Sequence, residues 1–208
     1  RYLFACRPDT EGIPLVKMSP VEIEARDGLM LPCFYSRPAG WNGEAKLPLG
    51  VMVNGGPWAR DSWGYNPYHQ WLTNRGHAVL NVNFRGSTGF GKDFLNAGNR
   101  EWYAKMQDDV NDTAQWAVDQ GWADADRLAI MGGSYGGYAT LAGMTRDPEL
   151  WACGVDIVGP SPIPTLLFTI PPYRGPMKVV FETRVGSQDD PAYLNPTPPP
   201  TTPHRIPQ

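Results

Sequence analysis

The sequence predicts an α/β protein with a mostly parallel sheet and helices on both faces. Three observations support this class. Short apolar runs that suit buried strands recur at residues 49–53, 77–84 and 128–131. Helical patterns separate these runs, most clearly at residues 101–120. The 208 residues, 41% of them hydrophobic, suffice for one domain of this kind and are few for two.

The N-terminal part predicts an arm followed by a β-hairpin. Residues 1–18 show no hydrophobic period, so we expect them to form an N-terminal arm. Apolar and charged residues then alternate over residues 21–26, Asp27 and Gly28 supply a turn, and residues 29–35 return as a second strand. The folded domain is therefore expected to begin at residue 19.

The middle of the chain predicts alternating strands and helices. A glycine- and proline-rich loop at residues 37–48 leads into the first buried strand, and residues 66–75 predict a short helix. Residues 154–158 predict the last strand. Within residues 101–120, apolar residues three or four apart predict an amphipathic helix, namely Trp102, Met106, Val110, Ala114 and Ala117.

Proline marks the end of the predicted domain. Thirteen of the 22 prolines follow residue 159, although residues 163–173 and 176–184 still allow helical turns. Proline removes hydrogen-bond donors, and the last residues offer little to bury. We therefore expect an α/β domain, partial in extent, at residues 19–194 and a proline-rich disordered tail at residues 195–208.

The candidate nucleophile is Ser134, in a turn between the strand at 128–131 and a helical run at 138–144. The turn reads Gly132-Gly133-Ser134-Tyr135-Gly136, a G-x-S-x-G pattern. A turn sharp enough to lift a serine hydroxyl above a sheet brings backbone segments together, so its flanking positions must be nearly free of side chains. The alternative is an ordinary glycine-rich turn, but the strand before it and the helix after it favour the catalytic interpretation.

Three separated motifs resemble the catalytic domain of the prolyl oligopeptidase family of serine peptidases. They are Asn54-Gly-Gly-Pro-Trp58, Asn83-Phe-Arg-Gly-Ser-Thr-Gly-Phe-Gly91 and Gly-Gly-Ser134-Tyr-Gly-Gly-Tyr138. The most similar branch is the acylaminoacyl-peptidase and dipeptidyl-peptidase-like one. The resemblance implies an α/β-hydrolase fold, preceded in larger relatives by a β-propeller. It also implies cleavage of a peptide or ester substrate through an acyl-enzyme on Ser134.

An oxyanion hole of backbone N–H groups is the second part of such a site. The turn itself places the N–H of Tyr135. Gly55 and Gly56 resemble the family's His-Gly-Gly-Pro loop, which implies that Gly56 supplies the second donor. This chain has Asn54 where many relatives have histidine, a change that keeps the backbone donors and removes any role of an imidazole. The alternative is a plain Gly-Gly-Pro turn.

Two residues are candidate substrate contacts. Trp58, with Trp63, Tyr65 and Tyr68, would line an apolar acyl pocket, although aromatic residues at such spacing are as often part of a core. Arg85 would either hold a substrate carboxylate or brace its own loop, and we favour the bracing role.

The general base is the part of this site that the sequence does not clearly supply. A serine nucleophile needs a base, usually a histidine oriented by a carboxylate, and hydrolases with this turn follow the chain order Ser, Asp or Glu, His. His204, in the tail, is the one histidine that follows Ser134, and Asp189 or Asp190 would be its acid partner. The family's acid and histidine segments are not found. We therefore expect a fold that is incomplete at its C-terminal end, truncated or altered there, and weak or incomplete activity.

Other titratable residues have simpler interpretations. His69 and His77 precede the nucleophile and are expected to be packing or surface residues. Asp156, in the predicted strand at 154–158, is equally open to a role in the site and to a structural role. Cys153 is expected to be a small buried hydrophobic residue.

The composition of the chain argues against several classes of protein and of site. The net charge of −3 without a basic patch predicts no nucleic-acid partner, and no apolar run reaches the roughly 18 residues that suggest a membrane span. Three cysteines without a C-x-x-C pair predict neither a metal site nor a disulfide framework. No cofactor is expected, and a reducing, cytoplasmic setting fits this composition.

Two other functions stay open. One is a small carboxylesterase that acts on short activated esters, which need less help with the leaving group than amides do. The other is a non-catalytic α/β fragment that forms a homo-oligomer through an exposed sheet edge.

Overall fold

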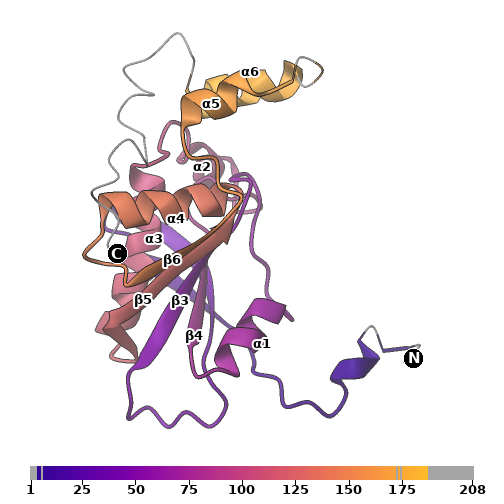
Figure 1. Cartoon of the computed structure of the whole chain (residues 1–208), viewed down its shortest axis with the longest axis vertical. Helices are drawn as coiled ribbons and strands as arrows, with labels where there is room; N and C mark the ends of the chain where they lie inside the picture. Colours follow the sequence, from indigo (N-terminus) through magenta and orange to yellow (C-terminus); the bar gives the residue numbers. More distant parts are fainter. Residues whose placement is uncertain (1–3, 6, 172, 174, 187–208) are drawn as a thin grey trace.

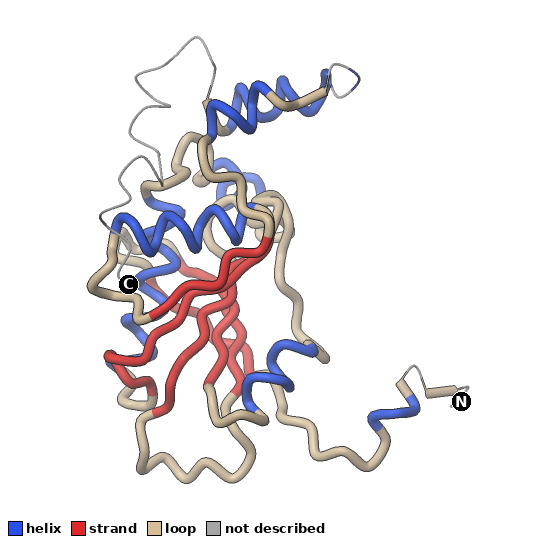
Figure 2. The backbone as a smooth tube through the Cα atoms, in the orientation of Figure 1, coloured by secondary structure: helices blue, strands red, loops and turns tan. Residues whose placement is uncertain are grey.

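The computed structural model describes residues 4, 5, 7–171, 173 and 175–186. It shows a six-stranded sheet with helices packed against it (Figures 1 and 2). The strands are β1 (Ser19–Glu24), β2 (Met30–Ser36), β3 (Leu47–Val53), β4 (Ala78–Val82), β5 (Ala123–Gly133) and β6 (Cys153–Ile157). The helices are η1 (Pro8–Thr10), α1 (Pro67–Thr73), α2 (Lys92–Asn96), α3 (Lys105–Asp119), α4 (Tyr135–Arg146), α5 (Ile163–Phe168) and α6 (Gly175–Arg184).

The sheet has the strand order β1-β2-β4-β3-β5-β6. β1 and β2 form the predicted hairpin, and β2 also runs antiparallel to β4. β3, β4, β5 and β6 are parallel, as the alternation of strands and helices predicted. Because the carboxyl ends of parallel strands lie at the same end of a sheet, the loops after β3, β4 and β5 lie close together there. Two of the sequence motifs lie in the loops after β3 and β4, and the third spans the end of β5, the turn at Ser134 and the start of α4.

Helices lie on both faces of the sheet. Gly50 of β3 faces α1, because a Cβ atom there would lie 3.5 Å from Leu72. The alternate residues Leu49, Val51 and Val53 point to the opposite face, where α3 and α4 pack (Figure 1). On that side α3 buries most of the predicted apolar stripe, namely Met106, Val110, Ala114 and Ala117. The amphipathic helix and the α/β class are therefore confirmed.

The face that carries α1 is only partly covered by the described part of the chain. A cavity of about 410 Å³ lies there, lined by Trp71 of α1, Met131 of β5 and Val155 of β6, among others. β6 is the last strand of the sheet and is exposed along its length. Cys153 also lines the cavity and is exposed, so the expectation that it is buried was wrong. The apolar character of its segment did not reveal whether anything packs on that face.

Element boundaries differ in detail from those predicted. β5 begins at Ala123, five residues before the predicted apolar run, because Ala123 also pairs with Leu47 of β3, ahead of an irregularity after which the pairing resumes at Leu128. The short helix α2 was not predicted. The predicted tail, residues 195–208, lies outside the described residues. Among the described helices, none combines the length and apolar character that crossing a lipid bilayer requires.

Candidate active site

The turn between β5 and α4 lies at the end of the sheet where the parallel strands finish (Figure 1). Ser134 makes this turn. Its backbone has φ 57° and ψ −118°, a conformation that residues with a side chain rarely adopt. Its N–H donates to the carbonyl of Ile157 in β6 at 2.9 Å, and the residue is exposed. Strand, strained exposed serine and helix are the geometry of a nucleophile elbow.

Two glycines allow β3 to approach this turn closely. A Cβ atom on Gly132 would lie 2.5 Å from the carbonyl oxygen of Val53, and one on Gly136 would overlap the same oxygen. The G-x-S-x-G spacing therefore has the steric cause that the sequence predicted. Backbone atoms occupy the space that a side chain at position 132 or 136 would need.

The loop after β3 passes directly beside the elbow. A Cβ atom on Gly55 would lie 3.0 Å from the carbonyl oxygen of Gly133 and 3.5 Å from Cβ of Ser134. Gly56 follows with φ 125°. Tyr135 is the first residue of α4, and N–H groups in the first turn of a helix point out of its N-terminus. The structure thus brings the loop of Gly56 and the helix start at Tyr135 together beside Ser134.

An aromatic cluster surrounds Tyr135. Its ring lies 5.1 Å from that of Phe84 and 4.6 Å from that of Trp102, between ring centroids. Phe181 of α6 packs on Trp102 at 6.3 Å and on Trp58 at 5.1 Å. Trp58 therefore belongs to an aromatic wall that reaches from the loop after β3 to the residue after the nucleophile. Sequence reasoning missed Trp102 and Phe181, because no local pattern shows that segments this far apart in the chain meet.

The other aromatic residues proposed for the acyl pocket lie elsewhere. Trp63 is 67% exposed and donates its Nε1–H to the carbonyl of Met18. The guanidinium of Arg7 lies over the ring of Tyr65, 4.4 Å from its centroid. Both aromatic residues contact the N-terminal arm, so the structure does not bring them together with Ser134.

Arg85 is buried between two carboxylates. Its guanidinium donates to Asp27 at 2.8 Å and to Asp109 of α3 at 2.7 Å, and its own N–H also donates to Asp109 at 2.8 Å. The hydrogen bonds from Arg85 hold the pKa of Asp27 well below its usual range. This geometry favours the bracing role of Arg85 over contact with a substrate carboxylate.

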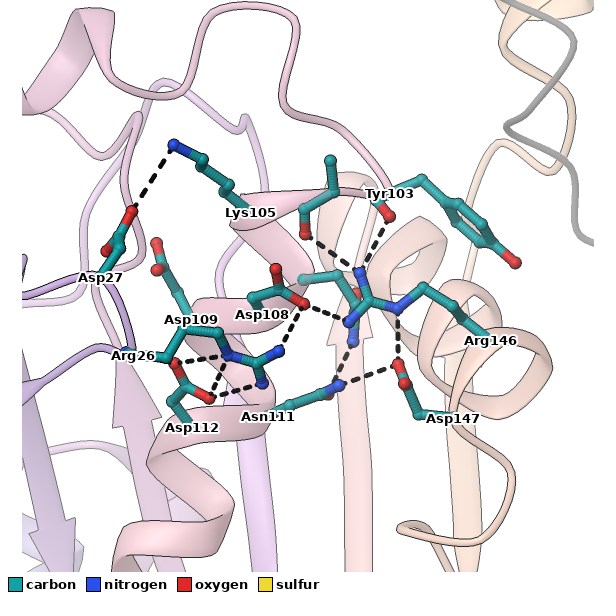
Figure 3. A network of polar contacts seen from close by, with 12 residues as sticks. Arg26, Asp27, Tyr103, Lys105, Asp108, Asp109, Asn111, Asp112, Arg146 and Asp147 are labelled. Carbon is teal, nitrogen blue, oxygen red and sulfur yellow. Dashed lines mark hydrogen bonds and ion pairs between the residues drawn. The ribbon is translucent and has the colours of Figure 1, made fainter.

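A neighbouring polar network joins α3 to the end of α4 (Figure 3). Arg146, the last residue of α4, pairs with Asp108 at 2.6 Å and with Asp147 at 2.7 Å. Asn111 of α3 donates to the same Asp147 at 2.8 Å. The helix that begins beside Ser134 is therefore fixed to α3 at its other end.

Neither described histidine is placed as a base for Ser134. His69 is buried, with Nδ1 2.8 Å from Oγ of Ser36 and its other ring nitrogen against Asn81. Burial lowers the pKa of His69. His77 precedes β4 and so lies at the amino ends of the parallel strands, whereas Ser134 lies at their carboxyl ends. Both positions fit the packing roles that the sequence suggested.

Asp156 is also engaged in local structure. Its Oδ1 accepts the N–H of Gly159 at 2.8 Å and lies where a Cβ atom on Gly137 of α4 would be. The carboxylate therefore stabilises the turn after β6 and packs against the start of α4, which favours the structural role.

The predicted base and acids, His204, Asp189 and Asp190, lie outside the described residues. Within the described part of the chain, no side chain forms a hydrogen bond with Oγ of Ser134. Nor do three histidine, cysteine, aspartate or glutamate side chains gather there as a metal site would require.

Comparison with known proteins points to one family. Residues 63–164 match the prolyl oligopeptidase family. The chain is 60% identical over 190 residues to dipeptidyl aminopeptidase BIII of Pseudoxanthomonas mexicana, an alignment that covers 88% of this chain and 28% of that protein. It is 31% identical over 133 residues to an acylamino-acid-releasing enzyme of Sus scrofa, covering 62% of this chain and 18% of that protein.

Solved structures give the same picture. A puromycin-hydrolyzing peptidase of Mycobacterium tuberculosis superposes with a TM-score of 0.79 at 28% identity, over 88% of this chain and 29% of that one. The acylaminoacyl peptidase of Pyrococcus horikoshii has a TM-score of 0.83 at 21% identity, over 96% of this chain and 32% of that one, which supports the fold. The chain spans less than a third of the length of these proteins.

Proposed function

Because this chain belongs to the prolyl oligopeptidase family of serine peptidases, we propose that it carries the nucleophile and the oxyanion hole of a serine hydrolase. The observation that supports this most is the exposed Ser134 held at φ 57° beside the start of α4. Oγ of Ser134 attacks the substrate carbonyl carbon, and the N–H groups of Tyr135 and Gly56 stabilise the negative oxygen. The leaving group departs with a proton, and water then hydrolyses the acyl-enzyme.

The general base is proposed to come from outside the described residues. His204, with Asp189 or Asp190, is the candidate in this sequence, since His69 and His77 are held elsewhere. Loss of the base lowers turnover by about 10⁴ to 10⁶ in serine proteases. If His204 does not reach Ser134, the 208 residues alone will therefore turn over weakly.

A peptide substrate is proposed for the whole protein. The 60% identity to a dipeptidyl aminopeptidase favours an activity of that kind over the release of acylamino acids, for which the similarity is lower. The aromatic wall that contains Trp58 and Phe181 favours an apolar side chain in the substrate next to the scissile bond.

Hydrolysis of a short-chain p-nitrophenyl ester by the wild-type chain and by Ser134→Ala tests this function. The proposal expects turnover by the wild type and none by Ser134→Ala. Ser62→Ala, which removes another exposed serine hydroxyl, should turn over like the wild type. Equal rates in wild type and Ser134→Ala would contradict the proposal. Turnover of the ester without turnover of a dipeptide p-nitroanilide would favour the small carboxylesterase.

Self-association is a second candidate property, supported by the exposed strand β6. Within the described part of the chain, no strand pairs with the outer edge of β6. Val155 and Ile157 are 49% and 41% exposed there. Unpaired apolar edge strands favour association with another chain, and a homo-oligomer is therefore proposed.

A further inference from the structure

We propose that Asn83 is a positioning residue of the oxyanion hole. It would hold residues 54–61, here called the oxyanion loop, in place beside the nucleophile elbow. The inference rests on the proposed function, because it takes Gly56 of this loop as an oxyanion donor.

The side chain of Asn83 binds the backbone of Asp61 at the far end of the oxyanion loop. Its Oδ1 accepts the N–H of Asp61 at 2.8 Å, and its Nδ2 donates to the carbonyl of Asp61 at 3.3 Å. One amide thus satisfies both polar groups of one backbone residue, as a neighbouring strand would. The oxyanion loop is fastened at its C-terminal end by this pair of bonds.

The position of Asn83 is itself fixed by the sheet. Asn83 follows β4, is fully buried, and donates its backbone N–H to the carbonyl of Pro32 in β2 at 3.1 Å. The start of the oxyanion loop is tied to the same place, since Nδ2 of Asn54 lies 3.4 Å from the carbonyl oxygen of Val82. Both ends of the loop are therefore anchored at the end of β4.

A displacement at Asp61 would reach Gly56 because the oxyanion loop is tightly folded. A Cβ atom on Gly56 would lie 2.7 Å from the backbone nitrogen of Trp58 and 3.0 Å from that of Ala59. The carbonyl of Ala59 also accepts the N–H of Thr88 at 2.9 Å. Oxyanion donors act only within about 2.7–3.1 Å of the developing charge, so a small shift of the loop weakens them.

Asparagine is the side chain that fits this task. Aspartate at position 83 would keep the acceptor for the N–H of Asp61 and lose the donor to its carbonyl. Alanine would lose both and leave two partly buried backbone groups of Asp61 without these partners. Both variants therefore disrupt the clamp.

The test compares wild type, Asn83→Ala and Asn83→Asp, with Asn111→Ala as the matched control. Asn111 is also a buried asparagine, but its hydrogen bond joins α3 to Asp147, far along the chain from the oxyanion loop. Three quantities are measured: hydrogen–deuterium exchange of peptides that contain residues 54–61, kcat for the p-nitrophenyl ester, and KM for the same ester.

The proposal expects exchange in the oxyanion loop to rise about tenfold in Asn83→Ala, with kcat down about tenfold and KM within about twofold. Asn83→Asp should also raise loop exchange and lower kcat relative to the wild type, and it decides the matter if Asn83→Ala does not fold. Asn111→Ala should leave all three quantities unchanged. Unchanged loop exchange in a folded Asn83 variant, or a loosened loop with wild-type kcat, overturns the proposal. If the wild type has no turnover, the proposed function fails separately, and loop exchange alone decides whether Asn83 is the clamp.

Discussion

At the scale of single residues, the glycines of the elbow link the site to the packing of β3. Gly136 shows this most directly, because a Cβ atom there would overlap the carbonyl oxygen of Val53. We predict that Gly136→Ala lowers the free energy of unfolding by about 3 kcal/mol, the upper range for overpacking, since backbone must move. Urea denaturation measures this. Gly175→Ala is the control, because that glycine has open space around it at the start of α6. A Gly136→Ala protein as stable as wild type would refute the steric account of the motif.

At the scale of elements, Arg85 ties the turn after β1 to α3 through Asp27 and Asp109. The pKa of Asp27 is lowered in the folded state, so its ion pair stabilises the fold above the ordinary aspartate pKa of about 3.9 and is lost as the pH falls below it. We predict that Asp27→Asn is less stable than wild type at pH 7 and that the difference shrinks below about pH 4. Urea titrations at several pH values measure it, with exposed Asp9→Asn as the control. A difference that does not change with pH would argue against the ion pair.

At the scale of the whole molecule, the two edges of the sheet differ. β1 carries exposed Glu22 and Glu24, charges that discourage pairing with another chain, whereas β6 carries exposed Val155 and Ile157. We predict that the chain self-associates and that Val155→Lys shifts it toward monomer. Light scattering after gel filtration measures the mass, and Glu22→Lys on the other edge should leave it unchanged. A wild-type chain that stays monomeric would count against association through β6.

The sequence predicted the features that depend on local patterns and missed those that depend on contacts between distant segments. The elbow at Ser134 was predictable because the sharp turn requires glycines beside the serine. The amphipathic stripe of α3 was predictable because its apolar residues recur every three or four positions within one segment. The contact of Phe181 with Trp58 was not, because it depends on how α6 returns to the site. Nor was the exposure of Cys153, which depends on what covers one face of β6. Asn83 appeared in a recognised motif, but its clamp on Asp61 became visible only in three dimensions.

Ser134 is proposed as the nucleophile, and covalent labelling tests this role. The chain is incubated with a fluorophosphonate, which phosphonylates activated serines, and is then digested and analysed by mass spectrometry. We expect one adduct, on the peptide that contains Ser134, and no adduct in Ser134→Ala. An unmodified Ser134 in the folded chain, or a label on another serine that persists in Ser134→Ala, would contradict it.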